Sequence, residues 1–170
     1  MAESRVAETT APGPWVESFD EFWRRDHRAV LGLAAALCGD WSAAEDLTQD
    51  AFLSAQRSWD RIVSPSAWVR RVVVNRAVSR RRRLAREAAA LVRLAGRTEP
   101  VVLGEEPDGF WDAVRGLPAR QAKVVVLYYL EDRPVADIAV LLGLAAGTVK
   151  ATLSAARRNL ARQLNTDEDH

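Results

Sequence analysis

The sequence has few of the residues that build disulfides, metal sites and catalytic centres. Cys38 is the only cysteine among 170 residues, so no internal disulfide can form. This usage fits a reducing compartment, and we expect a cytoplasmic protein in which Cys38 is a small buried residue at a helix end. His27 and His170 are the only histidines, and neither has a cysteine or histidine at metal-ligand spacing. We therefore expect no metal and no other cofactor.

Motifs of enzymes and membrane proteins are missing as well. No Gly-rich phosphate loop is present, because the stretch 143–147 is too short and follows a predicted helix. No serine stands beside a base that has its own orienting partner. No apolar run reaches the 18 or more residues of a membrane span, and the N-terminus lacks a basic-then-apolar leader. The sequence predicts a protein that performs no catalysis and binds no membrane.

Lysine is scarce, and the charges that are present are segregated along the chain. Only Lys123 and Lys150 are lysines among 24 basic residues, and the net charge is +1. Residues 57–97 carry 12 basic and 2 acidic residues, whereas residues 98–112 carry 5 acids and no base. Two basic blocks suggest two nucleic-acid contacts, and arginine favours bidentate phosphate or base contacts. Each charged face taken alone is also typical of ordinary solvated surface, and a GC-rich genome produces the same arginine bias.

Helical periodicity predicts an all-α fold with two small helical domains joined by an acidic linker. Residues 1–14 are small and polar and are expected to be disordered. The first domain is expected over residues 15–92, the linker over 93–109 and the second domain over 110–165. Asp26 interrupts the first helical pattern, which ends at Gly39, so one long helix or two short ones fit.

The stretch from Ser42 to Arg86 organises the first domain. Ser42 and Glu45 have the spacing of a capping box at the start of an acidic helix. A loop with prolines and serines follows, and then a helix that ends in four consecutive arginines, Arg80 to Arg83. An acidic face suits a basic protein surface, and an arginine-rich face suits phosphate.

The motifs AEDLTQDAF (residues 44–52) and AWVRRV (residues 67–72), with Asn75, closely resemble the second conserved region of bacterial sigma factors. The extracytoplasmic-function type is the nearest. The resemblance implies that the acidic helix docks on core RNA polymerase through Glu45, Asp46, Gln49, Asp50, Phe52 and Leu53. It also implies that the following loop and helix handle the −10 promoter element through Trp59, Asp60, Arg61, Ser64, Trp68, Arg71, Asn75, Arg76 and Arg80. By default each of the two tryptophans is a core residue.

The second domain holds a helix-turn-helix pattern. Residues 135–142 form one predicted helix, Gly143 lies in the turn, and a longer helix follows from Ala146. Residues 124–130 read equally well as a buried strand, but the flanking helical segments favour a helix. The helix-turn-helix pattern is similar to the fourth conserved region of the same sigma factors, which binds the −35 element. The resemblance assigns this contact to Arg133, Thr148, Lys150, Ala151, Thr152, Ser154 and Arg157.

This second domain departs from the family pattern. Ala151, Thr152 and Ala155 stand where the family usually has a Ser-Arg pair and a further arginine, so few guanidinium groups remain to contact bases. Ala145 at the N-cap should cost about 1 kcal/mol relative to a serine. Small side chains near Lys150 suit thymine methyl groups instead.

The linker is acidic through Glu99, Glu105, Glu106 and Asp108. The resemblance implies that it threads towards the catalytic cleft of polymerase, and a solvated spacer fits equally well.

We interpret the chain as a promoter-specificity subunit that binds core RNA polymerase and both promoter elements, with an anti-sigma factor as a further partner that the resemblance admits. The first alternative is a helix-turn-helix regulator that acts on palindromic DNA without polymerase. The second is a helical adaptor whose basic faces bind acidic proteins. The acidic helix separates the first interpretation from a plain regulator, and the helix-turn-helix separates it from an adaptor.

Overall fold

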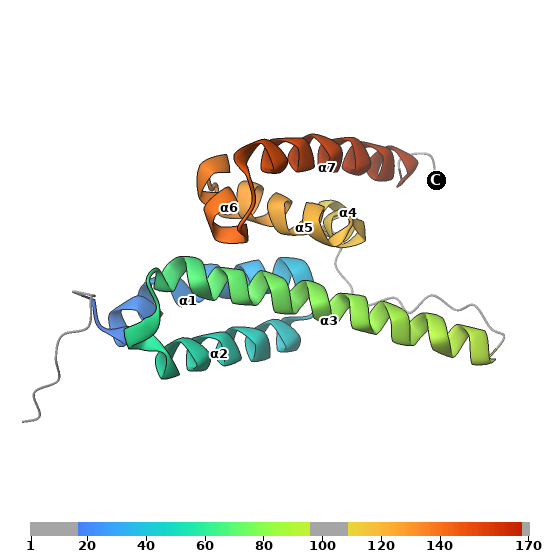
Figure 1. Ribbon diagram of the computed structural model, residues 1–170. Helices are drawn as coiled ribbons and strands as arrows, with labels where there is room; N and C mark the ends of the chain where they lie inside the picture. The colour runs from blue at the N-terminus through green and yellow to red at the C-terminus, as the bar shows by residue number, and fades with distance from the viewer. Residues whose placement is uncertain (1–16, 96–108, 168–170) are drawn as a thin grey trace, which may run out of the picture.

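The computed structural model describes residues 17–95 and 109–167, and in these ranges every regular element is a helix (Figure 1). In chain order they are α1 (Phe19–Cys38), α2 (Trp41–Arg57), the 3₁₀ turn η1 (Trp59–Arg61), α3 (Pro65–Ala95), α4 (Gly109–Gly116), α5 (Ala119–Val125), the π-helical turn η2 (Val126–Leu130), α6 (Val135–Leu142) and α7 (Ala146–Asp167). The all-α prediction is confirmed. The expected disordered N-terminus and most of the acidic linker lie outside the described residues.

Helix α1 is continuous, so the alternative of two short helices is wrong. Ser18 and Glu21 form its capping box: the Ser18 N–H donates to the Glu21 carboxylate at 2.9 Å, and the Glu21 N–H donates to Ser18 Oγ at 3.3 Å. The helix ends at Gly39, whose φ of 67° is a left-handed conformation that favours glycine. Asp26 does not break the helix because its carboxylate is paired inside the molecule.

Helix α2 begins two residues earlier than the capping box at Ser42 predicts. Asp40 is the N-cap, and its carboxylate accepts the N–H groups of Ser42 at 3.1 Å and Ala43 at 3.5 Å. Glu45 accepts a hydrogen bond from the Trp41 indole at 3.0 Å rather than reaching back to a cap. The predicted box is therefore wrong, because aspartate at position 40 already satisfies the first N–H groups.

Helices α1, α2 and α3 form a bundle whose core is aromatic near the start of α1. The Phe22 ring lies 5.3 Å from Phe52 and 5.2 Å from Trp59, measured between ring centroids. Fully buried alanines such as Ala44 and Ala51 let α2 approach its neighbours closely. The C-terminal part of α3 projects past α1 and α2 (Figure 1), and the residues from Arg82 onward in the described helix are mostly exposed.

Helices α4 to α7 lie together on one side of this bundle (Figure 1). The ambiguous segment after Lys123 is helical, with Val124, Val125, Val126 and Leu127 fully buried. Helices α6 and α7 meet at an angle of 105°, and Gly143, with φ of 66°, forms the turn between them. This geometry confirms the helix-turn-helix prediction. Within the described residues no single helix passes the length and hydropathy test for a membrane span; only the bent α6–α7 pair does, when joined.

The two halves share one apolar core. Leu37 of α1 and Val74 and Val78 of α3 belong to the same buried cluster as Val114 of α4 and Ile138 of α6. The sequence motifs predict two helical units but do not predict this common core. Its formation buries one face of α3 against α5 and α6.

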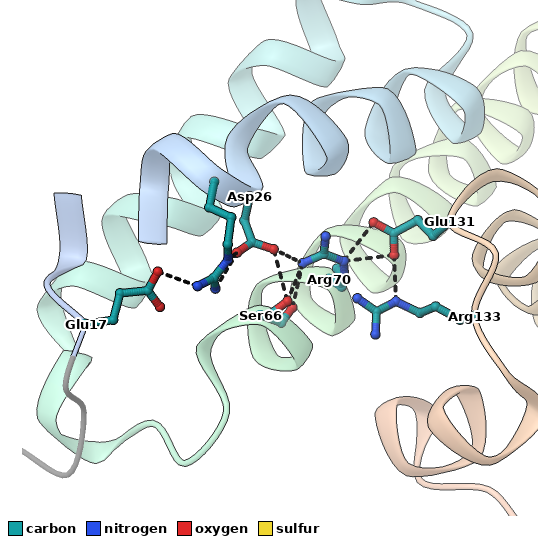
Figure 2. Close-up of polar contacts among 7 residues, drawn as sticks. Glu17, Asp26, Ser66, Arg70, Glu131 and Arg133 are labelled. Atoms are coloured by element: carbon teal, nitrogen blue, oxygen red, sulfur yellow. Dashed lines mark hydrogen bonds and ion pairs between the residues drawn. The ribbon is translucent and has the colours of Figure 1, made fainter. Parts of the chain in front are cut away.

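A buried arginine connects the halves at the edge of this core (Figure 2). Arg70 is 5% exposed, and its Nε lies 2.7 and 2.8 Å from the two carboxylate oxygens of Glu131. Its Nη1 donates to Asp26 Oδ1. Arg25 pairs with Asp26 at 2.6 Å, and Arg133 pairs with Glu131 at 2.9 Å. We call these five residues the Arg70 cluster.

The cluster shifts the ionisation of Asp26. Burial alone would raise the pKa of this carboxyl, but the hydrogen bond and charge of Arg70, with the bonds from Arg25 and Ser66, outweigh burial. The pKa of Asp26 therefore lies below its ordinary value. A carboxyl with a lowered pKa stabilises the folded state above its ordinary pKa and loses that contribution as the pH falls towards the folded pKa.

We predict that Asp26→Asn lowers the free energy of unfolding by about 2–4 kcal/mol near neutral pH, because it removes one partner of a buried charge. The difference between wild type and variant should shrink as the pH falls from about 5 to 3, across the ordinary aspartate pKa of about 3.9. Urea titrations of both proteins at several pH values measure it. A difference that stays constant over this range contradicts the assignment.

We also predict that Asp40→Ala destabilises the protein by about 1 kcal/mol, because two N–H groups of α2 lose their acceptor. The matched change Ser42→Ala should stay within about 0.5 kcal/mol, as for other surface positions. Chemical denaturation of the two single variants compares them. A larger loss of stability for Ser42→Ala than for Asp40→Ala would support the capping box at Ser42 instead.

Candidate functional site

A groove between α1 and α2 holds most of the acidic residues predicted to meet polymerase. Its volume is about 500 Å³, and its lining consists of Phe19, Trp23, His27, Leu31, Glu45, Asp46, Gln49, Phe52, Leu53 and Gln56. Glu45 and Asp46 are exposed on the α2 side, and Trp23 and Leu53 are each 42% exposed. The groove thus combines an acidic wall with exposed apolar side chains, which suits a basic, amphipathic protein surface.

The six predicted polymerase contacts are not equivalent in the structure. Glu45, Asp46, Gln49, Asp50 and Leu53 are exposed on α2. Phe52 is 3% exposed and packs on Phe22, so its ring is part of the core and of the groove wall rather than an outward contact.

Sequence reasoning missed the α1 side of this groove. The Trp23 and His27 rings lie 4.7 Å apart, and His27 lies 5.7 Å from Phe52. The i, i+4 spacing of an aromatic and a histidine was visible in the sequence. It was not distinctive beside the neighbouring core stripe of Phe19 and Phe22.

The loop predicted to read the −10 element surrounds a core tryptophan. Trp59 packs on Phe19 at 5.4 Å between ring centroids and is half-buried. This position agrees with the default expectation that the tryptophan is a core residue. Asp60, Arg61 and Ser64 are exposed beyond it. Val63, which sequence reasoning did not single out, is 85% exposed at the same place. An apolar side chain so open to water, in a short loop beside polar residues, can contact an unstacked base.

Helix α3 presents some predicted −10 residues and encloses another. Arg71 and Arg76 are exposed, and Arg80 is half-buried with its Nη2 3.9 Å from Asp40. Trp68 is half-buried and packs against the core of the bundle. Asn75 Oδ1 accepts a hydrogen bond from Lys123 Nζ at 2.5 Å, so its amide faces the C-terminal half.

Two basic groups at the junction of the halves are shielded from solvent. The Arg81 Nη2 donates to the Leu117 carbonyl at 3.1 Å, and burial, followed by the nearby Arg115 charge, lowers the pKa of Arg81. The pKa of Lys123 is also lowered, first by burial and then by Arg82 and Arg120. Arg81 lies in the run Arg80 to Arg83, and nothing in the sequence separates it from the other three arginines. In the structure, its hydrogen bond to the C-terminal half does so.

The predicted −35 residues lie mostly on the outer face of α7. Lys150, Ala151, Ser154 and Arg157 are exposed, and Thr148 is half-buried. Thr152 is turned inward: it is 9% exposed, and its hydroxyl donates to the Thr148 carbonyl at 2.7 Å.

The two predicted −35 arginines have partners inside the protein. Arg157 Nε donates to Tyr129 Oη at 2.8 Å, and Arg133 is held by Glu131. Among residues 109–164, whose side chains the structure describes, Lys150 is the basic residue of this set that is exposed and has no hydrogen-bond or ion-pair partner.

Comparison with known proteins fits both halves of this description. The family model for sigma-70 region 2 matches residues 22–87, and the model for sigma-70 region 4 matches residues 108–160. The ECF RNA polymerase sigma factor SigM of Mycobacterium tuberculosis is 36% identical over 154 residues, which is 86% of this chain and 77% of the relative. The RNA polymerase sigma-E factor of Streptomyces avermitilis is 30% identical over 156 residues, covering 89% and 87%.

A solved structure has the same arrangement of elements. The sigma factor RpoE of Bartonella quintana, in complex with the anti-sigma factor NepR, superposes with a TM-score of 0.67 at 25% identity, covering 88% of this chain and 98% of that one. The chain therefore belongs to the extracytoplasmic-function RNA polymerase sigma factors, with sigma-70 regions 2 and 4, and directs core polymerase to promoters.

Proposed function

We propose that the groove between α1 and α2 is the surface through which this sigma factor docks on core RNA polymerase. The observation that carries the proposal is the acidic wall of Glu45 and Asp46, with the polar Gln49 beside them, in the same open groove as the exposed Trp23. Exposed tryptophans are frequent energetic centres of protein interfaces, and complementary charge steers association. Asp50 and Leu53 extend the same face of α2, and the buried Phe52 packs between this face and the core of the bundle.

For promoter DNA we propose a division of labour between residues 15–92 and residues 110–165, with residues 93–109 as the connecting linker. The exposed arginines of α3, Arg71 and Arg76, and the half-buried Arg80 contact phosphates near the −10 element. Asp60, Arg61, Val63 and Ser64 surround the base that is read there, because a base taken out of the stack can be read on its pairing edge.

The −35 contact of α7 is small and weakly charged. Lys150 supplies the exposed cation, and Ala151 and Thr148 offer methyl groups that suit thymine. The Nε of Arg157 is held by Tyr129 and the Nε of Arg133 by Glu131, so part of each guanidinium is already used inside the protein. We infer that the arginine-rich first half carries more of the promoter affinity than α7 does.

Two further assignments rest on the family rather than on a site. As an RNA polymerase subunit the protein works in the cytoplasm, where polymerase and promoter meet. RpoE of Bartonella quintana is bound by the anti-sigma factor NepR, and we propose that this chain too has an anti-sigma partner. The alternatives of a regulator acting without polymerase and of a helical adaptor are set aside, because both sigma regions match in order.

The polymerase assignment predicts that the double reversal Asp46→Arg and Asp50→Arg abolishes co-elution with core enzyme, because like charges then face the basic partner surface. A matched double reversal, Asp20→Arg with Glu87→Arg, makes the same change of charge at exposed positions outside the groove. It should still co-elute. Size-exclusion chromatography with core polymerase, with circular dichroism to check folding, tests both. Co-elution of a folded Asp46 and Asp50 variant contradicts the docking assignment.

The promoter assignment predicts different profiles for three kinds of variant when every single-base promoter substitution is scored. Arg76→Ala should weaken all promoters alike and reduce the salt dependence, because it removes a phosphate contact. Val63→Ala with Ser64→Ala should change preference at −10. Lys150→Ala should change preference at −35 by no more than about tenfold per base, the low end of a base contact. If Lys150→Ala loses all sequence preference at −35 while the loop variant keeps its preference at −10, the proposed division of labour is contradicted.

A further inference from the structure

The C-terminal part of α3 extends beyond the three-helix bundle (Figure 1). From Arg82 to Arg93 every side chain is exposed except Val92, which is half-buried. We call residues 82–93 the α3 arm. The arm carries four arginines and one acid, Glu87. The −10 residues proposed above end at Arg80, so the functions assigned so far use none of the arm.

Three arginines of the arm share one face of the helix. Arg82, Arg86 and Arg93 are separated by four and seven residues, which correspond to about one and two turns of about 3.6 residues each. The exposed leucines of the arm, Leu84 and Leu91, lie on the opposite face. The basic face therefore lacks the apolar centre that is typical of a protein interface, and it suits a polyanion.

The arginines of the arm are weakly engaged by the rest of the protein. Among the described residues, the side chains of Arg82 and Arg93 have no hydrogen-bond or ion-pair partner. Arg86 donates only to the Arg82 carbonyl, at 3.3 Å. Arg83 lies 3.5 Å from Glu87, and both side chains are more than half exposed, so this pair contributes little to stability. The guanidinium groups of the arm are thus available to a partner outside the chain.

The arm keeps its helical form without a core to pack on. Four alanines and four arginines, all good helix formers, make up most of its twelve residues. Like charges four residues apart, as in Arg82 and Arg86, destabilise a helix. Binding to a polyanion removes this repulsion, because its phosphates neutralise the arginines that face it.

We propose that the α3 arm binds backbone phosphates of the duplex spacer beside the −10 element, on the side of the −35 element. This inference rests on the proposed −10 contacts of Arg71 and Arg76, which lie earlier on the same helix. The arm continues α3 towards the chain segment that leads to the proposed −35 half, so it points from one promoter element to the other. From Arg82 to Arg93 the helix rises about 17 Å, which is the length of about five base pairs.

A contact of this kind strengthens binding to every promoter alike. Phosphates carry no sequence information, and each contact releases counterions from the DNA. The arm therefore adds affinity that the small −35 surface of α7 does not supply. It also fixes the direction in which the duplex leaves the −10 element.

The first test measures the salt dependence of promoter binding by the complex with core polymerase. The triple variant Arg82→Gln, Arg86→Gln and Arg93→Gln removes three charges and retains good helix formers. The plot of log affinity against log salt concentration should become shallower by about 2 to 3 units, because each phosphate contact contributes about 0.9. Preference among single-base promoter variants should not change.

Two matched variants control for charge and for folding. Arg24→Gln, Arg28→Gln and Arg120→Gln together make the same change of charge at exposed positions outside the proposed DNA and polymerase surfaces, and they should keep the wild-type salt dependence. Lysine at the three arm positions retains a positive charge for phosphate and should keep it as well. Circular dichroism verifies the helicity of each variant.

The second test changes the DNA. Neutral methylphosphonates replace the phosphates of about five base pairs beside the −10 element, the length that the arm covers. The neutral spacer should weaken binding of the wild-type protein and of the lysine variant. It should have no further effect on the glutamine variant, because a double-mutant cycle detects only groups that interact.

A folded glutamine variant with the wild-type salt dependence overturns the inference. Equal losses on the neutral spacer for wild type and glutamine variant overturn it too. Loss of co-elution with core polymerase in the absence of DNA would assign the arm to an acidic protein surface instead.

The same design separates this inference from the −10 assignment. Arg76→Ala is paired with methylphosphonates within the −10 element itself. If this pair shows no coupling while the arm and the spacer do, the −10 contact of Arg76 is wrong and the arm contact stands. The reverse pattern overturns the arm contact alone.

Discussion

The position of the C-terminal half depends on one buried guanidinium. Arg70 lies between a carboxylate from α1 and a carboxylate that follows η2, so it links elements that are 44 and 61 residues away in the chain. Burying three charges together is costly, and it is tolerated because each has more than one partner. The apolar core shared by α1, α3, α4 and α6 supplies affinity between the halves, and the charges make the contact specific.

The acidic and basic segments of the sequence form separate charged surfaces on neighbouring helices of the structure. The acids of α2 face outward beside Trp23, on a groove formed by α1 and α2 alone. The arginines of α3 follow on the next helix of the bundle, where some remain exposed and Arg81 is used to bind the other half. One short bundle thus carries the proposed protein-binding face, the proposed phosphate-binding face and an internal junction.

The helix-turn-helix half shows how an unusual sequence is accommodated. Helix α7 lacks the arginines that its family usually carries near Lys150, and Thr152 satisfies its hydroxyl within the helix. The arginine it does have at position 157 is ordered by the Tyr129 hydroxyl, and its guanidinium lies 5.7 Å from the Tyr128 ring centroid. These contacts stabilise the half internally, and the surface that we propose for a DNA duplex is correspondingly small.

The sequence alone determined the helices, the turn at Gly143, the outward acids of α2 and the membership of both halves in one family, because periodicity and short motifs report local structure. It misplaced the cap of α2, since Ser42 and Asp40 are both good caps and only the chain path decides between them. The partner of Arg70, the inward turn of Thr152 and the engagement of Asn75 by Lys123 were decided by the tertiary structure. Contacts between residues dozens of positions apart depend on how helices pack, and a helical repeat specifies only which face is buried, not what buries it.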